Sequence, residues 1–291
     1  MNGIEMSETE SDRSTIKIAY IANLYPLLSE TYIVSELKTL GKAGFQVQVF
    51  SLFKPRANEN ARPDAELLAH TTYVSPDLRV RRLIPAHFHF LLHAPSVYFK
   101  TLRYAFRHRN RQSSFLSFVR MALTPVEQRQ KLAFEDRQNI LAHFFVVMPF
   151  ARRMKCEGYT WMHAAFANIP ASFALLTGQL CGIPYSISSH AMDLFIKPEL
   201  LPEKFNQARF VVTCTQFNKK YLQEHYPGID LNRVHAIYHG TDVNRFVNPD
   251  RSDKAEPPVL LSVGRLVRKK GLGVLLKACL TLQQKGIPFQ C

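Results

Sequence analysis

The feature that most constrains the fold is a strand–helix–strand pattern at the start of the chain. Residues 16–22 (IKIAYIA) form a continuous apolar run of the kind found in buried parallel strands. A helix pattern follows Ser29, with Ile33 and Leu37 on one face. Residues 45–53 then alternate apolar and polar side chains, which indicates a second strand. A crossover of this length predicts two parallel strands joined by a right-handed connection.

The same pattern recurs in the second half of the chain. Short apolar runs separated by helical segments predict further strands over 160–165, 185–189, 210–214 and 234–238. Asn168 and Pro170 suit the first positions of the helix after the first of these strands, and Gly182 suits its end. Alternating strands and helices predict an α/β fold with an open, doubly wound parallel sheet of the Rossmann-like kind.

The last stretch of the sequence repeats the pattern once more. Residues 258–264 predict a strand, the next residues a helix, and residues 287–291 the beginning of another strand. One strand, one helix and a short extended piece cannot bury a core, since a domain usually needs roughly 50–250 residues. We therefore expect a complete first domain and the opening β–α unit of a truncated second domain. The expected segments are a flexible tail at 1–14, a first domain at 15–247 with a helical insertion at about 76–158, a linker at 248–257, and the second domain from 258 to 291.

Cysteine usage and hydropathy limit the classes of protein that fit. The five cysteines are scattered and form no CxxC pair, so we expect neither a disulfide framework nor a zinc site. No apolar run reaches the roughly 18–20 residues that span a bilayer. The polar, acidic N-terminus does not have the pattern of a signal peptide. These features predict a cytoplasmic protein.

A basic and aromatic segment carries much of the net charge of +14. Between Leu78 and Val126 there are nine Lys or Arg residues and no Asp or Glu. Helical spacing aligns two stripes there, an apolar one at Phe99, Leu102 and Phe106 and a basic one at Lys100, Arg103 and Arg107.

Three interpretations of this segment, about 79–120, stay open. The apolar stripe can face the core while the basic stripe faces solvent. Alternatively, the helix can lie in the headgroup region of an anionic membrane, which predicts a peripheral protein on the inner face of the cell membrane. Nucleic acid is the least favoured partner, because the sequence contains no recognisable element for reading bases.

Ligands of doubly wound sheets bind at the carboxyl ends of the strands. That rule directs attention to the segments that follow the predicted strands, which are 23–31, 163–168, 190–193, 213–216, 239–242 and 264–271.

The most specific local signal is SVGRLVRKKG, at 262–271. Gly264 ends a predicted strand, Arg265 follows it, and Lys270 and Gly271 precede a helix. Cations are unfavourable at a helix N-terminus unless an anion binds there, and a diphosphate suits both the helix dipole and the charges. The alternative is a solvated basic turn. Neither GxxxxGK[ST] nor GxGxxG is present, so the sequence supports neither a P-loop nor a nicotinamide site.

Several motifs in order along the chain resemble the retaining family 4 glycosyltransferases of the GT-B fold. Within that family they look most like the colanic-acid and exopolysaccharide enzymes. The motifs are YPLLSETYIVSEL at 25–37, WMHAAFAN at 161–168, GIPYSISSHAMDLF at 182–195, VVTCTQFNKKYL at 211–222, VHAIYHGTDVNRF at 234–246 and VLLSVGRLVRKKG at 259–271.

This resemblance implies roles for particular residues. Arg265 and Lys270, with Gly264, would hold the diphosphate of a nucleotide-sugar donor, and His190 would sit at the reacting sugar. A structural histidine bonded to backbone is the alternative for His190. The family generally needs no metal, and the chain has no DxD motif, so we expect no metal and no cofactor.

The resemblance also assigns the loop that faces the acceptor or the phosphates. That loop contains Ser29, Glu30 and Thr31, and it has no glycine pair, unlike many relatives. Ser29 can instead serve only as a helix cap. His163 fits the first histidine loop of the family, and a structural residue at a strand end is the alternative for it.

Two functions from different classes are therefore expected. The favoured one is a hexosyltransferase that moves a sugar from a nucleoside-diphosphate sugar to a lipid-linked saccharide in cell-surface polysaccharide assembly. The family carries a late pair of glutamates, seven residues apart, and that pair has no counterpart in the sequence. The alternative is consequently a non-catalytic fragment that keeps only acceptor or membrane affinity.

Overall fold

The computed structural model describes residues 13, 15–27, 30–55, 68–74, 80–109, 139–196, 198–241, 243–246, 256–264 and 266–291. The chain divides into two compact units, Met1–Gly240 and Thr241–Cys291.

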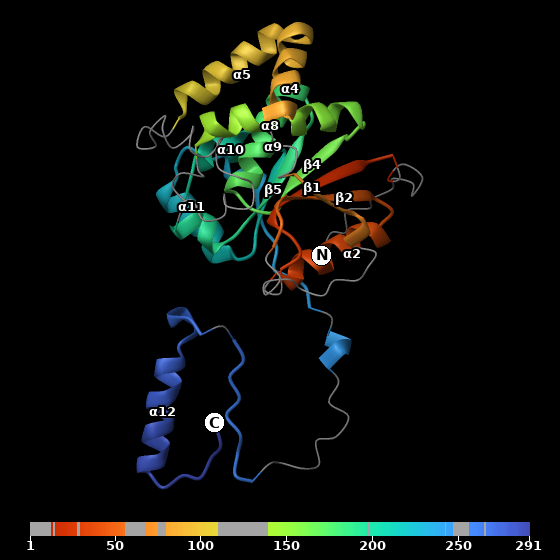
Figure 1. The fold of residues 1–291 in the computed structure, drawn as a ribbon. Helices are drawn as coiled ribbons and strands as arrows, with labels where there is room; N and C mark the ends of the chain where they lie inside the picture. Colours follow the sequence, from red (N-terminus) through yellow and green to blue (C-terminus); the bar gives the residue numbers. More distant parts are fainter. Residues whose placement is uncertain are drawn as a thin grey trace, which may run out of the picture. The chain divides into compact units, whose positions relative to one another are not determined.

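The first unit is built on a parallel sheet of seven strands (Figure 1). The strands are β1 (Lys17–Leu24), β2 (Gln46–Phe53), β3 (Thr71–Tyr73), β4 (Trp161–Ala164), β5 (Tyr185–Ser189), β6 (Phe210–Thr213) and β7 (Val234–Ala236). Their order across the sheet is β3-β2-β1-β4-β5-β6-β7, and every pairing is parallel. The doubly wound α/β fold predicted from the sequence is therefore confirmed.

The strand order reverses between β1 and β4. From β1 the chain moves outward to β2 and β3, and after the insertion it returns to pair β4 with the other side of β1. Tyr20 lies opposite His163 in this central pair. A doubly wound sheet binds its ligands at such a switch point, outside the carboxyl ends of the strands.

Helices cover both faces of the sheet. Alternate residues of β1 show the two faces, since Ala19 and Ile21 join one hydrophobic cluster and Tyr20 and Ala22 join the other. The helix α2 packs on the second face, and α4, α5, α8 and α9 contribute to the cluster on the first. The helices of this unit are α2 (Thr31–Lys42), α4 (Val80–His93), α5 (Pro95–Arg107), α8 (Ile140–Cys156), α9 (Ile169–Cys181), α10 (Leu201–Gln207) and α11 (Gln216–His225), with a π-helix η3 (Met192–Ile196) and a 3-10 turn η4 (Leu231–Arg233).

A histidine joins the three described helices of the insertion. Pro149 lies inside α8 and has no backbone N–H, so the carbonyl of Phe145 loses its helical donor. Nε2 of His87, on α4, donates to that carbonyl at 2.9 Å. Nδ1 of the same ring is 2.9 Å from the hydroxyl of Tyr98, on α5, which donates to it. Burial lowers the pKa of His87, consistent with a neutral ring that donates at one nitrogen and accepts at the other.

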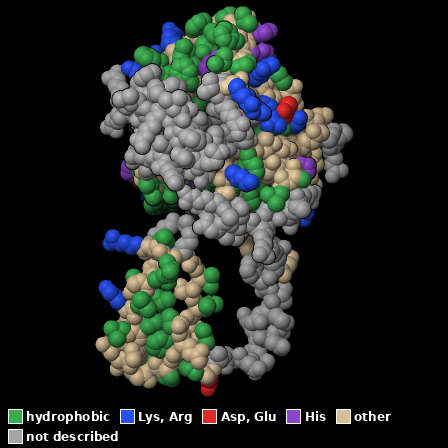
Figure 2. All heavy atoms as spheres, viewed as in Figure 1, with side chains coloured by type: hydrophobic (Ala, Val, Ile, Leu, Met, Phe, Trp, Pro, Cys, Tyr) green, Lys and Arg blue, Asp and Glu red, His purple; other side chains and the backbone are tan. Residues whose placement is uncertain are grey.

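The outward face of α5 differs from the interpretation that places its apolar stripe in the core. Phe99 and Phe106 are 57% and 54% exposed, and Leu102 packs only partly against the core, whereas Tyr98, Thr101 and Ala105 are the buried residues of this helix. The core face is therefore offset from the stripe of phenylalanines by about one residue. Hydrophobic, basic and histidine side chains gather on the surface near the labelled positions of α4 and α5 (Figure 2).

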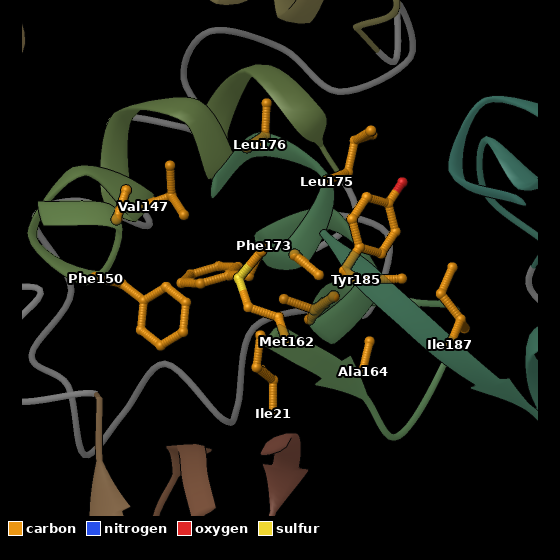
Figure 3. Packing of buried hydrophobic residues seen from close by; sticks show 14 of the residues in the cluster. Ile21, Val147, Phe150, Met162, Ala164, Phe173, Leu175, Leu176, Tyr185 and Ile187 are labelled. Carbon is orange, nitrogen blue, oxygen red and sulfur yellow. The ribbon is translucent and has the colours of Figure 1, made fainter. Parts of the chain in front are cut away.

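The main core lies between the sheet and the pair α8 and α9. Phe150 and Phe173 come from these two helices and point toward Met162 and Ile21 of the central strands (Figure 3). The Phe50 and Phe150 rings meet edge to face with centroids 5.4 Å apart, a favourable geometry for aromatic pairs.

Within its described residues, the second unit contains one α-helix, two 3-10 turns and one isolated bridge. The helix α12 (Leu272–Gln284) lies where the sequence predicts one, after the 3-10 turn η6 (Arg268–Lys270); η5 (Val243–Phe246) precedes them both. The strand predicted at 258–264 is reduced to an extended segment with one isolated parallel bridge, between Val259 and Gln290. Its apolar residues Leu261 and Val263 are 83% and 87% exposed. A ladder needs a neighbouring strand along its length, and within 256–264 and 266–291 only this bridge forms.

Two glycines inside helices give a direct test of the packing of α9 against β5. A Cβ on Gly178 would lie 3.1 Å from the carbonyl oxygen of Ile183 and 3.3 Å from Cδ1 of Tyr185, whereas Gly41 in α2 has nothing within 4 Å. Gly178→Ala should therefore lower the free energy of unfolding by about 1–3 kcal/mol through overpacking. Gly41→Ala should raise it by about 0.5–1 kcal/mol. Urea unfolding followed by circular dichroism measures both, and equal shifts of the two variants would contradict the close contact.

Candidate functional site

The candidate site lies at the carboxyl edge of the sheet, at the switch point between β1 and β4. Nδ2 of Asn23, on β1, donates to Oδ1 of Asn168, just after β4, at 2.9 Å. This bond joins two segments that lead to opposite faces of the sheet. Oδ1 of Asn23 is buried and finds no hydrogen-bond partner among the described residues.

His190 directly follows β5, and rings from three other segments surround its imidazole. The ring of Tyr32, on α2, lies 5.0 Å away between centroids, and that of Phe166, after β4, lies 5.1 Å away. His239, after β7, stacks on His190 at 5.4 Å with only 6° between the planes. The structure therefore brings segments from across the sheet together at this histidine.

The imidazole of His190 is held neutral. Burial, followed by the nearby His239 and His163, lowers the pKa of His190 to about 4. At pH 7 one ring nitrogen carries a proton and the other a lone pair. Nδ1 is buried and has no partner within the described part of the chain. A neutral ring with an unused nitrogen can hydrogen-bond a hydroxyl group of a bound ligand.

Two buried charges fix the backbone next to this ring. Oδ2 of Asp193 accepts from the backbone N–H of Ala167 at 3.0 Å and from that of His190 at 3.2 Å. Nζ of Lys204, on α10, donates to the carbonyl of Ala167 at 2.9 Å and to that of Asn168 at 3.2 Å. Asp193 thus joins the segments after β4 and β5, and Lys204 holds the first of these segments through the carbonyls of Ala167 and Asn168.

Two carboxyl groups of the site have raised pKa values. Burial raises the pKa of Asp193 to about 6, against the opposing effect of its two backbone hydrogen bonds and Lys204. Burial, and then the charge of Asp193, raises the pKa of Glu30 to about 7. Oδ1 of Asp193 and Oε2 of Glu30 are buried with no partner among the residues that the structure describes. Such acceptors, beside a neutral imidazole, suit a ligand rich in hydroxyl groups.

His163 lies inside the sheet, in β4. Its Nδ1 is 2.8 Å from Oγ of Ser186 and its Nε2 is 3.1 Å from Oγ of Ser188. Oε1 of Glu36 is 3.7 Å from Nε2, and the other oxygen of Glu36 accepts from Tyr20 at 2.9 Å. Burial lowers the pKa of His163, which Glu36 opposes. These contacts occupy both ring nitrogens, as expected of a residue that positions strands.

The other predicted site residues fall in several places. Thr31 is the first residue of α2 and is exposed, and Glu30 is the N-cap residue, a position that the sequence favours for Ser29. Ser29 and Arg265 lie outside the described residues. Gly264 and Lys270 belong to the second unit, where Lys270 is exposed. Across the described ranges, no group of three or more His, Cys, Asp or Glu side chains is arranged to hold a metal ion.

Sequence reasoning did not single out Tyr32, Phe166, Asp193 or His239 as individual site residues. Phe166, Asp193 and His239 fall in segments that follow predicted strands. The rule that ligands bind at the carboxyl ends of strands therefore pointed to these segments, but not to the individual residues. A further signal for Asp193 was its position three residues after His190. At that spacing its carboxylate can accept a hydrogen bond from the backbone N–H of His190. Tyr32 resembled an ordinary helix residue.

Comparison with known proteins adds to this geometry. Residues 103–245 match the family model described as Glycosyltransferase Family 4. The central part of the chain is therefore similar to the glycosyltransferases of family 4. This segment contains β4, β5, β6 and β7 with the residues that surround His190, apart from Tyr32 and Glu30.

Two curated relatives are similar along almost the whole chain. One is a candidate colanic acid biosynthesis glycosyltransferase (WcaL) of Escherichia coli (strain K12), 22% identical over 283 residues. The other is an amylovoran biosynthesis glycosyltransferase (AmsK) of Erwinia amylovora, 22% identical over 280 residues. Each alignment covers 94% of this chain and 63% of the relative. These findings support a glycosyltransferase of the family 4 kind. In addition, none of the helices described here has the length and apolar character needed to cross a bilayer.

The raised pKa of Glu30 predicts a change of stability with pH. A carboxyl group whose pKa is higher in the folded state stabilises the fold less as pH rises from about 4.5 to about 7. Glu30→Gln removes this charge, so it should raise the free energy of unfolding by about 1–3 kcal/mol at pH 8, with little gain at pH 4.5. Thermal unfolding between pH 4.5 and 8.5 measures the difference.

Glu224→Gln is the matched control, because Glu224 is exposed on α11 and forms only a 3.8 Å ion pair with Lys220. Its effect should vary little over the same range. A gain for Glu30→Gln that is constant with pH, or absent at pH 8, would contradict the burial of this carboxylate.

Proposed function

We propose that the protein is a retaining glycosyltransferase that transfers a sugar from a nucleotide-sugar donor to a lipid-linked saccharide in exopolysaccharide biosynthesis. The observation that carries the proposal is the neutral, partly unsatisfied imidazole of His190 at the switch point of a doubly wound sheet, within the residues that match family 4. The names of the two relatives, which concern colanic acid and amylovoran, support the polysaccharide context. The chain spans 63% of their length, so the activity of the whole protein belongs to the proposal.

In this proposal, His190 orients a hydroxyl group of the bound sugar. A neutral imidazole serves here better than a charged one, because it can accept a hydrogen bond as well as donate one. Asp193, whose Oδ2 accepts from the backbone N–H of His190, would hold this residue in place for that role.

The donor diphosphate is assigned to the second unit. Lys270 precedes α12, whose first N–H groups and helix dipole favour an anion. A Cβ built on Gly264 would lie 3.6 Å from Cδ of Lys270, so the glycine lies directly against the lysine side chain. Lys270 and Arg265 would then stabilise the charge that develops on the leaving diphosphate.

The proposed partners also include an anionic membrane surface, contacted through about residues 79–120. Within that range the described helices are α4 and α5, and the exposed Phe99 and Phe106 support the assignment. The neighbouring exposed cations Arg103 and Arg107 suit acidic headgroups.

The role of His190 can be tested by transfer from radiolabelled UDP- and GDP-hexoses to a polyprenyl-diphosphate saccharide. His190→Ala should lower the rate at least about 100-fold, in the range typical of a lost acid–base or orienting group. His225→Ala, which removes an exposed histidine on α11, should leave the rate near that of the wild type. Wild-type turnover by His190→Ala would refute the role, and a wild-type chain that binds acceptor without turnover would instead support the non-catalytic alternative.

The diphosphate assignment predicts a separate effect on binding. Lys270→Gln should weaken the binding of UDP and GDP about 10-fold, because a charge-assisted hydrogen bond to phosphate is lost. Lys277→Gln, which removes an exposed lysine further along α12, is the control. Isothermal titration calorimetry measures both, and equal affinities for the two variants would remove Lys270 from the proposed donor site.

A further inference from the structure

We propose that a groove between α4 and α8 binds the phosphate of an anionic phospholipid headgroup. The inference rests on the proposed membrane contact and deepens it by naming a site and a ligand. The groove has a volume of about 610 Å³ and is lined by arginines from both helices, Arg81 and Arg82 from α4 and Arg152 and Arg153 from α8. That volume is in the range of pockets that hold small molecules, so a headgroup fits within it.

The packing of α4 against α8 brings these arginines together. The bond between His87 and the carbonyl of Phe145 joins the two helices. The groove is lined by residues that precede His87 on α4 and by residues that follow Phe145 on α8. Pro85 and Pro149, one inside each helix, line the groove between them.

Two arginines of the groove, Arg81 and Arg152, contribute charge that the described carboxylates do not balance. Nε of Arg153 donates to Oε1 of Glu157 at 2.7 Å. Among the described residues, no carboxylate forms an ion pair with Arg81 or Arg152. The guanidinium groups of Arg81 and Arg152 line the same concavity and repel each other, and a bound phosphate would remove that cost. The planar, bidentate donors of arginine suit phosphate oxygens.

An exposed apolar stripe borders the groove on α4. Ile84, Phe88 and Leu92 are 52%, 58% and 75% exposed, and their spacing of four residues places them along one side of the helix. Phe99 and Phe106 add exposed rings on α5. Single-stranded nucleic acid can stack its bases on aromatic rings, but the exposed aliphatic Ile84 and Leu92 offer no such stacking, whereas a membrane accommodates apolar groups below its phosphates. The stripe and the arginines together favour a lipid headgroup as the occupant.

The groove is distinct from the site around His190. The end of α8 leads into the start of β4, and Nζ of Lys17, at the start of β1, donates to the carbonyl of Glu157 at 2.8 Å. Arg152 and Arg153 therefore lie toward the amino edge of the sheet, while His190 lies at the carboxyl edge. The arginines would anchor the protein without touching the donor or the reacting hydroxyl group.

Vesicle co-sedimentation of the full chain tests the proposal. The vesicles contain phosphatidylcholine alone, or phosphatidylcholine with phosphatidylglycerol or phosphatidic acid. The double variant Arg81→Gln and Arg152→Gln should lose about 10-fold or more in affinity for the anionic vesicles. Lys38→Gln and Lys42→Gln together are the matched control, because they remove the same charge from α2 on the opposite face of the sheet. This control should lose clearly less.

The arms of the experiment separate the possible failures. Absence of wild-type binding to any vesicle would refute the membrane partner, and the groove with it. A different result would keep the membrane partner and overturn the groove. In that result, vesicle binding falls with Phe88→Ser and Phe99→Ser, and the two charge variants lose affinity equally. Release by inorganic phosphate, at constant ionic strength and at the concentration of lipid phosphate, would assign the groove to a free anion. Tighter binding to single-stranded DNA than to vesicles, lost in the groove variant, would also overturn the proposal.

Discussion

The geometry of the candidate site depends on one residue, Ala167, whose backbone N–H and carbonyl are each bound by a buried charged side chain. Its N–H is bound by the carboxylate of Asp193, 2% exposed, and its carbonyl by the ammonium of Lys204, fully buried. Burial raises the pKa of Asp193, against its two backbone hydrogen bonds and then Lys204. Burial lowers the pKa of Lys204, against Glu199 and then Asp193. Burying charge is costly unless each group is well hydrogen-bonded. Here each group is hydrogen-bonded to backbone, and these bonds hold the segments after β4 and β5, and with them His190, in one arrangement.

The same buried environment decides which chemistry the site can perform. Removal of water keeps His190 neutral and raises the pKa values of Glu30 and Asp193 to about 7 and about 6. Near pH 7 the edge therefore presents a neutral imidazole and a partly protonated Glu30 beside the carboxylate of Asp193. Such a surface recognises hydroxyl groups better than it recognises phosphates, for which fixed cations are preferred. This division agrees with a proposal that gives the sugar to His190 and its neighbours and the diphosphate to a different, basic segment.

The sequence predicted the sheet well because each strand is a local signal. The apolar run before His190 is bounded by Pro184 and a polar segment, and the structure places β5 over the predicted residues. The environment of His190 was less predictable, since its rings come from Tyr32, Phe166 and His239, which meet only after the sheet has formed. On α5, helical spacing showed that two faces exist, but which face is buried depends on contacts with α8 that no local pattern reveals. The segment 258–264 has the composition of a strand, and strand formation also requires a neighbour.

The arginines of the insertion and the candidate site lie toward opposite ends of the strands in the sheet. The β4 strand begins just after the arginines of α8 and ends at the segment that Asp193 and Lys204 hold. A headgroup anchor at the amino edge would fix the distance of the carboxyl edge from the membrane through a rigid parallel sheet. An acceptor whose saccharide extends from a lipid would then have to reach along the strands to His190. On this argument the length of the sheet, and not only the shape of the site, would limit which lipid-linked saccharides are substrates.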